Sequence, residues 1–237
     1  MEYPSKIIIK SLSEYIKVLE ERISDRYRLI LFRGQNTDKP LIPKIARYSF
    51  KKSREVDEIN MFNDFVLNAK PYLNHELTSK LDQLIIAQHH GVPTRLLDWT
   101  ENALTALYFA TENPPQDSEE YIVVWVVGLD RNSNIIIKDS SIDPFKINSI
   151  KFYKPPSVIS RISSQMGWLS LHPYLGSGFY NGFKIKNSEN LKLTKLMIPK
   201  EYRKNIHENL NNCGVNKFTI YQDLDSLGKY IFEKYKK

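Results

Sequence analysis

Residues 87–100 read AQHHGVPTRLLDWT, and this polar stretch lies between two segments that have the periodicity of apolar helices. The segment Glu76–His90 has apolar residues at helical spacing, and Gly91 after it is typical of a helix end. The segment Ala103–Ala110 is apolar on most sides, which predicts a central helix with Thr100 as its N-cap. Because buried polar groups are costly unless they are paired, the stretch between these helices is either a satisfied internal network or a binding site.

Strands and helices alternate irregularly on both sides of this stretch. Residues Tyr27–Phe32 form a short apolar run that predicts a buried strand, followed by a turn at Arg33 and Gly34. Residues Tyr121–Leu129 carry the β-branched run of a core strand, and residues 139–156 are predicted to form a surface excursion. Further helices are expected at 11–22, 55–68, 200–213 and 224–235, and further strands at 134–138, 161–171, 183–186 and 193–198. The pattern predicts an α+β fold with a mixed or antiparallel central sheet and flanking helices.

The composition is that of a globular protein in a reducing compartment. The chain has 237 residues, of which 41% are hydrophobic and 26% charged, so it has enough apolar residues for a sizeable core. Its length, without repeats or a clear linker, favours a single domain over residues 1–237. A single cysteine, Cys213, excludes a disulfide framework. No apolar run is long enough for a membrane span and nothing marks export, so we expect a soluble cytoplasmic protein with no membrane partner.

Metal binding and thiol chemistry are both disfavoured. His89, His90 and Asp98 are metal-ligating residue types, but adjacent histidines on a helix point about 100° apart. No third ligand follows at the spacing of known zinc sites. Cys213 has no base implied beside it. We therefore expect neither a metal nor a cysteine nucleophile.

Three motifs together resemble the FRG domain family, which is named for its Phe-Arg-Gly motif. The motifs are LFRGQ at 31–35, AQHHGVPTRLLDWT at 87–100 with ALYFA at 106–110, and RISSQMGWLSLHP at 161–173. The Phe-Arg-Gly motif itself is at residues 32–34. The resemblance covers about residues 29–173, and a helical C-terminal part follows at 193–237. It implies that the chain is one FRG domain.

A more distant likeness is to ADP-ribosyltransferase folds. In those folds an Arg-Gly ends the first strand, a Ser or Thr element runs into an A-x-x-F-A helix, and a later strand bears Gln or Glu. Arg33, Thr100 with residues 106–110, and Gln165 occur here in the same order. The likeness implies a split sheet, NAD as cofactor, ADP-ribosyl transfer or NAD cleavage as the reaction, and a protein or nucleic acid as acceptor. It also implies a toxin or defence effector of a bacterium or phage.

The chemistry of NAD indicates which residues would bind it. A guanidinium suits the pyrophosphate, a glycine permits close approach, a hydroxyl orients a ribose, and an aromatic ring faces the nicotinamide. We expect Arg33, the stretch Gln88–Thr100 and the segment Arg161–Gln165 to converge on one cleft. The cofactor-binding residues expected on these grounds are Arg33, Gly34, Arg95, Trp99, Thr100 and Tyr108.

The expected catalytic residues are Asp98, Gln165, His89 and His90. Gln165 stands where the likeness places the last-strand residue, but an amide carries no charge to offset a developing cation. Asp98 or Glu101 is expected to supply that charge, and whether the chain turns NAD over stays open. The two histidines suit proton transfer or ring contact, and they suit the closing of a buried network equally well. An equal alternative for Arg95 is a structural bridge to Asp98.

Nucleic-acid binding is the main alternative function. Lysine and arginine outnumber aspartate and glutamate by 34 to 27, which gives a formal charge of +7. Basic residues interleave with Phe152, Tyr153 and Trp168, a pattern that suits phosphate tracking and base stacking and equally suits the coat of a sheet edge. The basic residues are Arg131, Lys146, Lys151, Lys154 and Arg161. No groove-reading motif appears, so this alternative is a non-catalytic binding or interaction module without base-sequence specificity.

Overall fold

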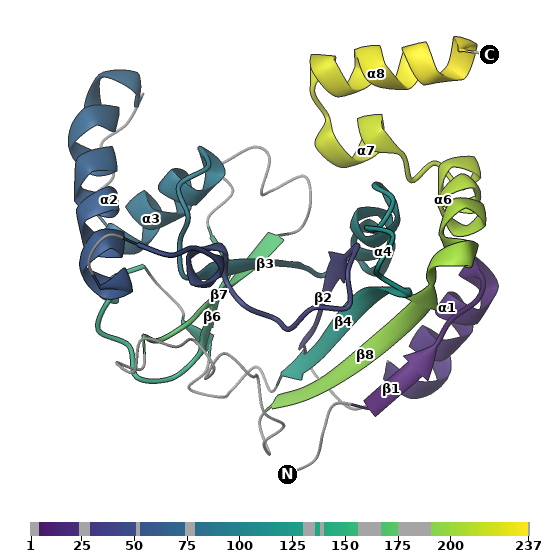
Figure 1. Cartoon of the computed structure of the whole chain (residues 1–237), viewed down its shortest axis with the longest axis horizontal. Coiled ribbons are helices and arrows are strands. Elements are labelled where there is room, and N and C mark those ends of the chain that lie inside the picture. The colour runs from purple at the N-terminus through teal and green to yellow at the C-terminus, as the bar shows by residue number, and fades with distance from the viewer. Residues whose placement is uncertain are drawn as a thin grey trace.

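The protein has a mixed β-sheet with helices packed against it, as seen in a computed structural model (Figure 1). The structure describes residues 5–23, 29–50, 53–73, 79–129, 136–137, 140–155, 167–174 and 191–236. In these residues eight strands form one sheet in the order β1-β8-β4-β2-β3-β7-β6-β5. The strands are β1 Ser5–Ile8, β2 Leu29–Gln35, β3 Leu96–Thr100, β4 Tyr121–Leu129, β5 Ile136–Ile137, β6 Lys151–Tyr153, β7 Gly167–Leu171 and β8 Leu191–Pro199. Only β1 with β8 and β5 with β6 pair in parallel among these strands, so the predicted α+β class with a mixed sheet is confirmed.

The helices form groups at the two ends of the sheet, with one helix over its middle (Figure 1). They are α1 Leu12–Val18, α2 Arg54–Ala69, α3 Lys80–His89, α4 Ala103–Thr111, α6 Arg203–Asn212, α7 Lys217–Tyr221 and α8 Leu224–Tyr235. Helices α2 and α3 pack beside β3 and β7, and α1 and α6 lie beside β1 and β8. Helix α4 covers β2 and β4. None of the described helices is long and apolar enough to cross a membrane.

The sheet is nearly divided between β2 and β3. Strand β2 pairs with β4 over its whole length, and β3 does the same with β7. Between β2 and β3, however, only Phe32 and Thr100 are in register. The two strands diverge beyond this pair, so the sheet consists of two halves joined at one point.

Strand β2 continues through Arg33 and Gly34, where the sequence predicted a turn. Successive strand side chains point to opposite faces. Phe32 packs in the core with α4, and Leu31 packs on the other face with Trp99. Arg33 therefore shares the face of Leu31, and Gly34 shares the face of Phe32. A Cβ atom on Gly34 would lie 2.6 Å from the backbone nitrogen of Ala110 and closer still to the carbonyl of Ala106. Glycine is needed here because the backbone of α4 lies directly on the strand.

Strand β3 was not predicted: it lies in the polar stretch between the two expected helices, and it changes the role of Thr100. The helix α4 begins after Asn102, whose side chain accepts hydrogen bonds from the amides of Leu104 and Thr105 at 2.9 and 3.1 Å. Thr100 is therefore not the N-cap; it ends β3, and its Oγ1 accepts from the amide of Asn102 at 3.0 Å.

Other predicted elements hold in part. The predicted surface excursion at 139–156 contains strand β6, and the predicted strand at 161–171 is described only as β7. The predicted strand at 183–186 lies outside the described residues.

Candidate functional site

A cavity of about 760 Å³ opens where β2 and β3 diverge. Residues 32–35 of β2 and residues 98–100 of β3 form two of its walls. The loop that follows β2 forms a third wall, and Ala106 and Phe109 of α4 form a fourth. Tyr221 from α7 completes the lining. The cavity therefore gathers segments that are far apart in the sequence, and it includes Arg33, Gly34, Asp98, Trp99 and Thr100 among the predicted residues.

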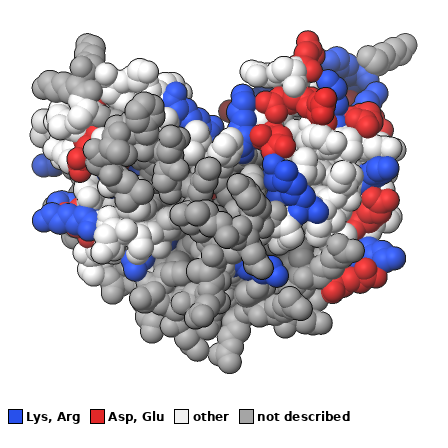
Figure 2. Space-filling model, turned by 60° about the horizontal axis from the view of Figure 1, so that its bottom comes forward, with Lys and Arg blue, Asp and Glu red and all other residues white. Residues whose placement is uncertain are grey.

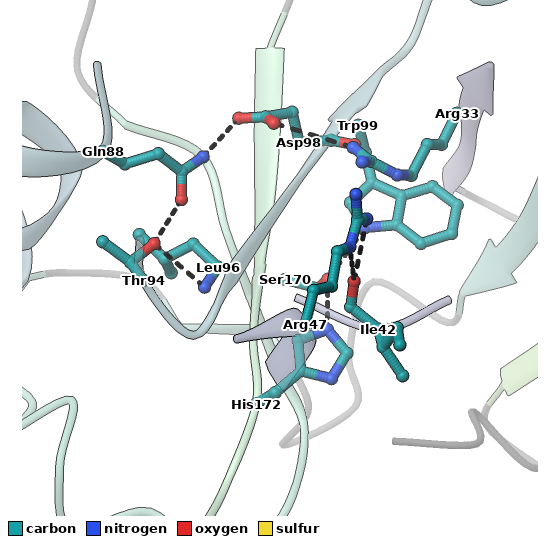
Figure 3. A network of polar contacts seen from close by, with 10 residues as sticks. All are labelled: Arg33, Ile42, Arg47, Gln88, Thr94, Leu96, Asp98, Trp99, Ser170 and His172. Carbon is teal, nitrogen blue, oxygen red and sulfur yellow. Dashed lines mark hydrogen bonds and ion pairs between the residues drawn. The ribbon is translucent and has the colours of Figure 1, made fainter. Parts of the chain in front are cut away.

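Arg33 connects the two diverging strands. Its Nη1 donates a hydrogen bond to the backbone carbonyl of Asp98 at 2.7 Å and lies 3.6 Å from Oδ2 of the same residue (Figure 3). If the β2–β3 ladder continued, Asp98 would lie opposite Gly34, so the guanidinium takes up a carbonyl that the divergence leaves without a strand partner on that side. Nε of Arg33 is buried without a hydrogen-bond partner among the described residues.

The positive charge of Arg33 is opposed by a second guanidinium nearby. Burial lowers the pKa of Arg33, Asp98 offsets part of this effect, and the positive charge of Arg47 lowers the pKa further. Arg47 also lines the cavity, and it donates from Nε and Nη2 to the carbonyl of Ile42 at 3.3 and 3.0 Å. Within the described part of the chain, no carboxylate lies within ion-pair distance of Arg47. Two like charges in the lining of one cavity favour an anionic ligand.

Lys39 adds a third cation to the lining of the cavity. Among the described residues, Asp98 is the only carboxylate in that lining. Lys39 is 3.6 Å from Glu119, a residue outside the cavity. The Asp98 side chain is 70% exposed, whereas that of Arg33 is 17% exposed. The carboxylate is thus accessible to a ligand, and the charges of the lining are predominantly positive.

A chain of hydrogen bonds from residues outside the cavity holds the Asp98 carboxylate (Figure 3). Gln88 in the last turn of α3 donates from Nε2 to Oδ1 of Asp98 at 2.6 Å. Oε1 of Gln88 accepts from the Thr94 hydroxyl at 2.5 Å, and Oγ1 of Thr94 accepts from the amide of Leu96 at 3.3 Å. Gln88 and Thr94 do not line the cavity. They fix one oxygen of a side chain that does.

The aromatic side of the site is anchored in the core. Trp99 is 3% exposed, and its Nε1 donates to Oγ of Ser170 at 2.8 Å. Oγ of Ser170 lies 2.8 Å from Nε2 of His172. Burial lowers the pKa of His172 to about 3, with a smaller contribution from the positive charge of Arg33. A neutral histidine therefore supports the wall that carries Trp99.

Two of the predicted cofactor-binding residues lie outside the cavity. Arg95 is fully buried, and its Nη2 and Nε pair with the carboxylate of Glu58 at 2.6 and 3.0 Å. The structural bridge expected between Arg95 and Asp98 is therefore wrong, because Arg95 pairs with α2 and Asp98 pairs with Arg33. Tyr108 is 2% exposed, and its hydroxyl donates to Glu112 at 3.3 Å. Burial and the charge of Glu112 raise the pKa of this hydroxyl.

The predicted catalytic residues have different positions. Asp98 lines the cavity, whereas His89 and His90 lie exposed at the end of α3 and do not. The His90 ring stacks on Phe65 with 6.4 Å between ring centroids. Gln165 lies outside the described residues.

Several lining residues were not identified from the sequence. Lys39 lies in the loop after β2, and Arg47 ends the short 3-10 helix Lys44–Arg47. No periodicity marks either residue, although binding residues are often found on such connecting segments. Phe109 lines the cavity in place of its neighbour Tyr108, since adjacent helix residues point about 100° apart. Gln88 was part of the polar stretch, but no feature of the sequence paired it with Asp98.

The aromatic residues of the predicted nucleic-acid surface are buried. Phe152, Tyr153 and Trp168 are 0%, 5% and 9% exposed. Trp168 Nε1 and Lys154 Nζ both donate to Oε1 of Glu101, at 2.7 and 2.6 Å. Figure 2 shows Lys and Arg interspersed with Asp and Glu over the described part of one face. These aromatic side chains are therefore part of the packed sheet in this fold.

The comparisons with known proteins support the first two of the three motifs. Residues 28–119 match the family model of the FRG domain. No curated protein and no solved structure matches the chain significantly, so the likeness to ADP-ribosyltransferases stays a prediction. The matched range runs from the start of β2 past the end of α4, and it includes the Arg33–Asp98 contact and the Gln88 chain. The chain therefore contains an FRG domain over residues 28–119, and most of the cavity is built from it.

Proposed function

We propose that the cavity between β2 and β3 binds a nucleotide with a pyrophosphate group, NAD in particular. The observation that carries this proposal is the pair of guanidiniums of Arg33 and Arg47 in the lining of the cavity, close enough for the charge of one to lower the pKa of the other. Arginine presents a planar fork of donors that matches phosphate oxygens. A pyrophosphate between these residues relieves the repulsion between like charges.

The dimensions and lining of the cavity suit a dinucleotide. A volume of about 760 Å³ lies in the range typical of sites for ligands of this size, roughly 300–1,000 Å³. The partly exposed Phe109 and Tyr221 contribute aromatic surface for a base or a nicotinamide, and the buried Phe32 and Trp99 complete the lining behind them. We assign Thr100, which lines the cavity beside Trp99 on β3, to the orientation of a ribose.

The proposed reaction is cleavage of the bond between nicotinamide and ribose. Nicotinamide leaves with the bonding electron pair, positive charge develops at the ribose carbon, and a water or acceptor nucleophile adds there with loss of a proton. Asp98 is the lining carboxylate that would stabilise this charge electrostatically. The acceptor in a transfer reaction is a protein or a nucleic acid. A role in defence or as a toxin belongs to the same proposal.

Isothermal titration calorimetry with NAD tests the binding step. Arg47→Ala removes a guanidinium that has no other ion pair among the described residues, so we expect NAD affinity to fall about 10- to 100-fold. Lys204→Ala is the matched control, because Lys204 is an 81% exposed cation on α6 outside the cavity. The affinity of the Lys204→Ala variant for NAD should equal that of the wild type. Absence of NAD binding, together with salt-dependent binding of RNA or DNA, would favour the nucleic-acid module instead.

Release of nicotinamide tests the chemical step separately. Asp98→Asn keeps the shape of the side chain and removes its charge. We expect the rate of nicotinamide release to fall about 10²-fold or more, with NAD affinity changed only a few-fold. An unchanged rate would leave nucleotide binding as the function and remove Asp98 from the reaction.

A further inference from the structure

We propose that Gln88 is a positioning residue for Asp98: it holds one carboxylate oxygen from outside the cavity, so that the other oxygen faces the ligand. This inference rests on the proposed function for the role of Asp98, but the hydrogen bonds that support it do not. Gln88 is four residues beyond Leu84 on α3, and Asp98 is on β3. The contact therefore links a helix end to the cavity wall.

The exposure of Asp98 makes a restraint necessary. A side chain that is 70% exposed would ordinarily exchange between rotamers, because little packing opposes rotation about χ1. Among the residues that the structure describes, Gln88 Nε2 donates the hydrogen bond that holds the side-chain oxygen Oδ1, at 2.6 Å. Arg33 lies 3.6 Å from the other oxygen, Oδ2, which is ion-pair distance without a tight hydrogen bond. Of these two contacts, the hydrogen bond from the Gln88 amide is the shorter, so it fixes the orientation of the carboxylate plane.

The orientation of the Gln88 amide is itself determined. An ionised carboxylate can only accept hydrogen bonds, so the NH₂ group of Gln88 faces Asp98 and its Oε1 faces Thr94. Thr94 then has to donate its hydroxyl proton to Oε1, and the 2.5 Å separation of the two oxygens agrees with this. The Thr94 side chain is 1% exposed, and its Oγ1 accepts from the amide of Leu96. Each donor and each acceptor in the series of hydrogen bonds from Leu96 to Asp98 is therefore fixed.

The anchor of this chain is rigid. Helix α3 has buried Leu81, Leu84 and Ile85, and its N-cap Ser79 accepts from the amides of Leu81 and Asp82. Gln88 lies one turn after Leu84 on this packed helix. The amide is therefore positioned by the core on one side and by Thr94 on the other.

The neutrality of Gln88 suits the proposed chemistry. A lysine at this position would also donate to Asp98, but its charge would oppose the positive charge that develops on the ribose. A glutamate would place a second acceptor beside the carboxylate and repel it. An amide donates without changing the net charge of the cavity, so Gln88 adds no further positive charge to oppose the effect of Asp98 on the ribose carbon.

The test uses Gln88→Met, which conserves the length of the side chain and removes both hydrogen bonds. We expect the turnover number for nicotinamide release to fall about 10²-fold, with KM changed less than about threefold. The midpoint of thermal unfolding should fall by only a few degrees, because the buried Thr94 hydroxyl loses its acceptor. Gln83→Met, on the same helix, is the matched control and should keep the turnover number of the wild type. A turnover number for Gln88→Met equal to that of Gln83→Met would overturn the proposal.

A second measurement needs no ligand, so it separates this proposal from the proposed function. In crystal structures of the ligand-free proteins, the Asp98 side chain should have a single conformation in the wild type and several in Gln88→Met. A single unchanged conformation in the variant overturns the positioning role, whatever the protein binds. If Asp98 is released in the variant but the wild type does not cleave NAD, the contact is supported and the proposed reaction is wrong.

Discussion

Arg33 and Asp98, which are 65 residues apart in the sequence, are joined by a 2.7 Å hydrogen bond from a guanidinium nitrogen to a backbone carbonyl. The bond spans the point at which β2 and β3 separate. The arginine of the Phe-Arg-Gly motif therefore has two roles, since it bridges the two strands and also lines the cavity between them.

Arg33→Lys separates the charge of this residue from its geometry. A lysine keeps the positive charge but cannot donate to the carbonyl and to a phosphate from one planar fork. We expect NAD affinity to fall about 10-fold or more, and the free energy of unfolding to fall by about 1–3 kcal/mol because the Asp98 carbonyl loses its donor. Calorimetry and urea unfolding measure the two effects. Wild-type affinity in this variant would show that charge alone suffices and that the fork has no role.

Gly34→Ala tests the packing of α4 on β2. The added methyl group would meet the backbone of Ala106 and Ala110, which cannot rotate away as a side chain can. We expect a loss of about 3 kcal/mol or more in the free energy of unfolding, or failure to fold. Gly228→Ala in α8 is the control, because nothing lies within 4 Å of the added methyl there. It should be neutral or stabilising by up to about 1 kcal/mol. A Gly34→Ala variant as stable as Gly228→Ala would contradict the close approach of α4.

The buried pair of Arg95 and Glu58 predicts strong coupling between two positions far apart in the sequence. Either single change, Arg95→Met or Glu58→Leu, leaves an unpaired buried charge and is expected to cost about 3–5 kcal/mol. The double variant should cost much less than the sum of the two, since no unpaired charge is left. A double-mutant cycle by chemical denaturation measures the coupling. Additive effects would mean that the two side chains do not pair.

His172 predicts that stability falls in mild acid. Its pKa is lowered to about 3 by burial, whereas an unfolded histidine titrates near 6.5. Below pH 6.5 the unfolded chain takes up a proton that the folded chain excludes, so stability falls as the pH falls; above 6.5 both states are neutral and the effect vanishes. The loss should reach about 2 kcal/mol between pH 7 and pH 5.

His172→Gln removes this contribution. Urea denaturation measures the difference in free energy of unfolding between the wild type and this variant. That difference should change by about 2 kcal/mol between pH 7 and pH 5. His90→Gln is the control for a histidine at the surface. Parallel pH profiles for the wild type and His172→Gln would mean that His172 is not excluded from protonation in the folded protein.

Elements whose apolar pattern is local were predictable from the sequence. Strand β4 at Tyr121–Leu129 and helix α8 at Leu224–Tyr235 have the predicted bounds. The β-branched run and the helical periodicity are each decided by neighbouring residues, so these elements need no knowledge of the rest of the fold.

Strand β3 was missed because it carries apolar residues on both of its faces. Leu96 packs with α3, whereas Leu97 and Trp99 pack on another cluster, so the segment shows no simple alternation. A strand of this kind lacks the half-buried period of two that identifies others.

The pairing of charges in the site depends on distant residues. Arg95 and Asp98 are three positions apart, which favoured a local bridge, but their partners are Glu58 and Arg33. Arg95 lies in the bend just before β3 and Asp98 lies within the strand, and the choice of partner follows from the direction in which each side chain leaves the backbone. A shift of one residue along a strand reverses that direction. The sequence therefore located the polar stretch of the site but not the contacts within it.

The most direct test of nucleotide binding is a crystal structure of the protein grown with saturating NAD. We expect the dinucleotide in the cavity between β2 and β3, with pyrophosphate oxygens within hydrogen-bond distance of Arg33 and Arg47 and a ribose beside Thr100. An empty cavity at saturating NAD, or NAD bound elsewhere on the protein, would contradict it.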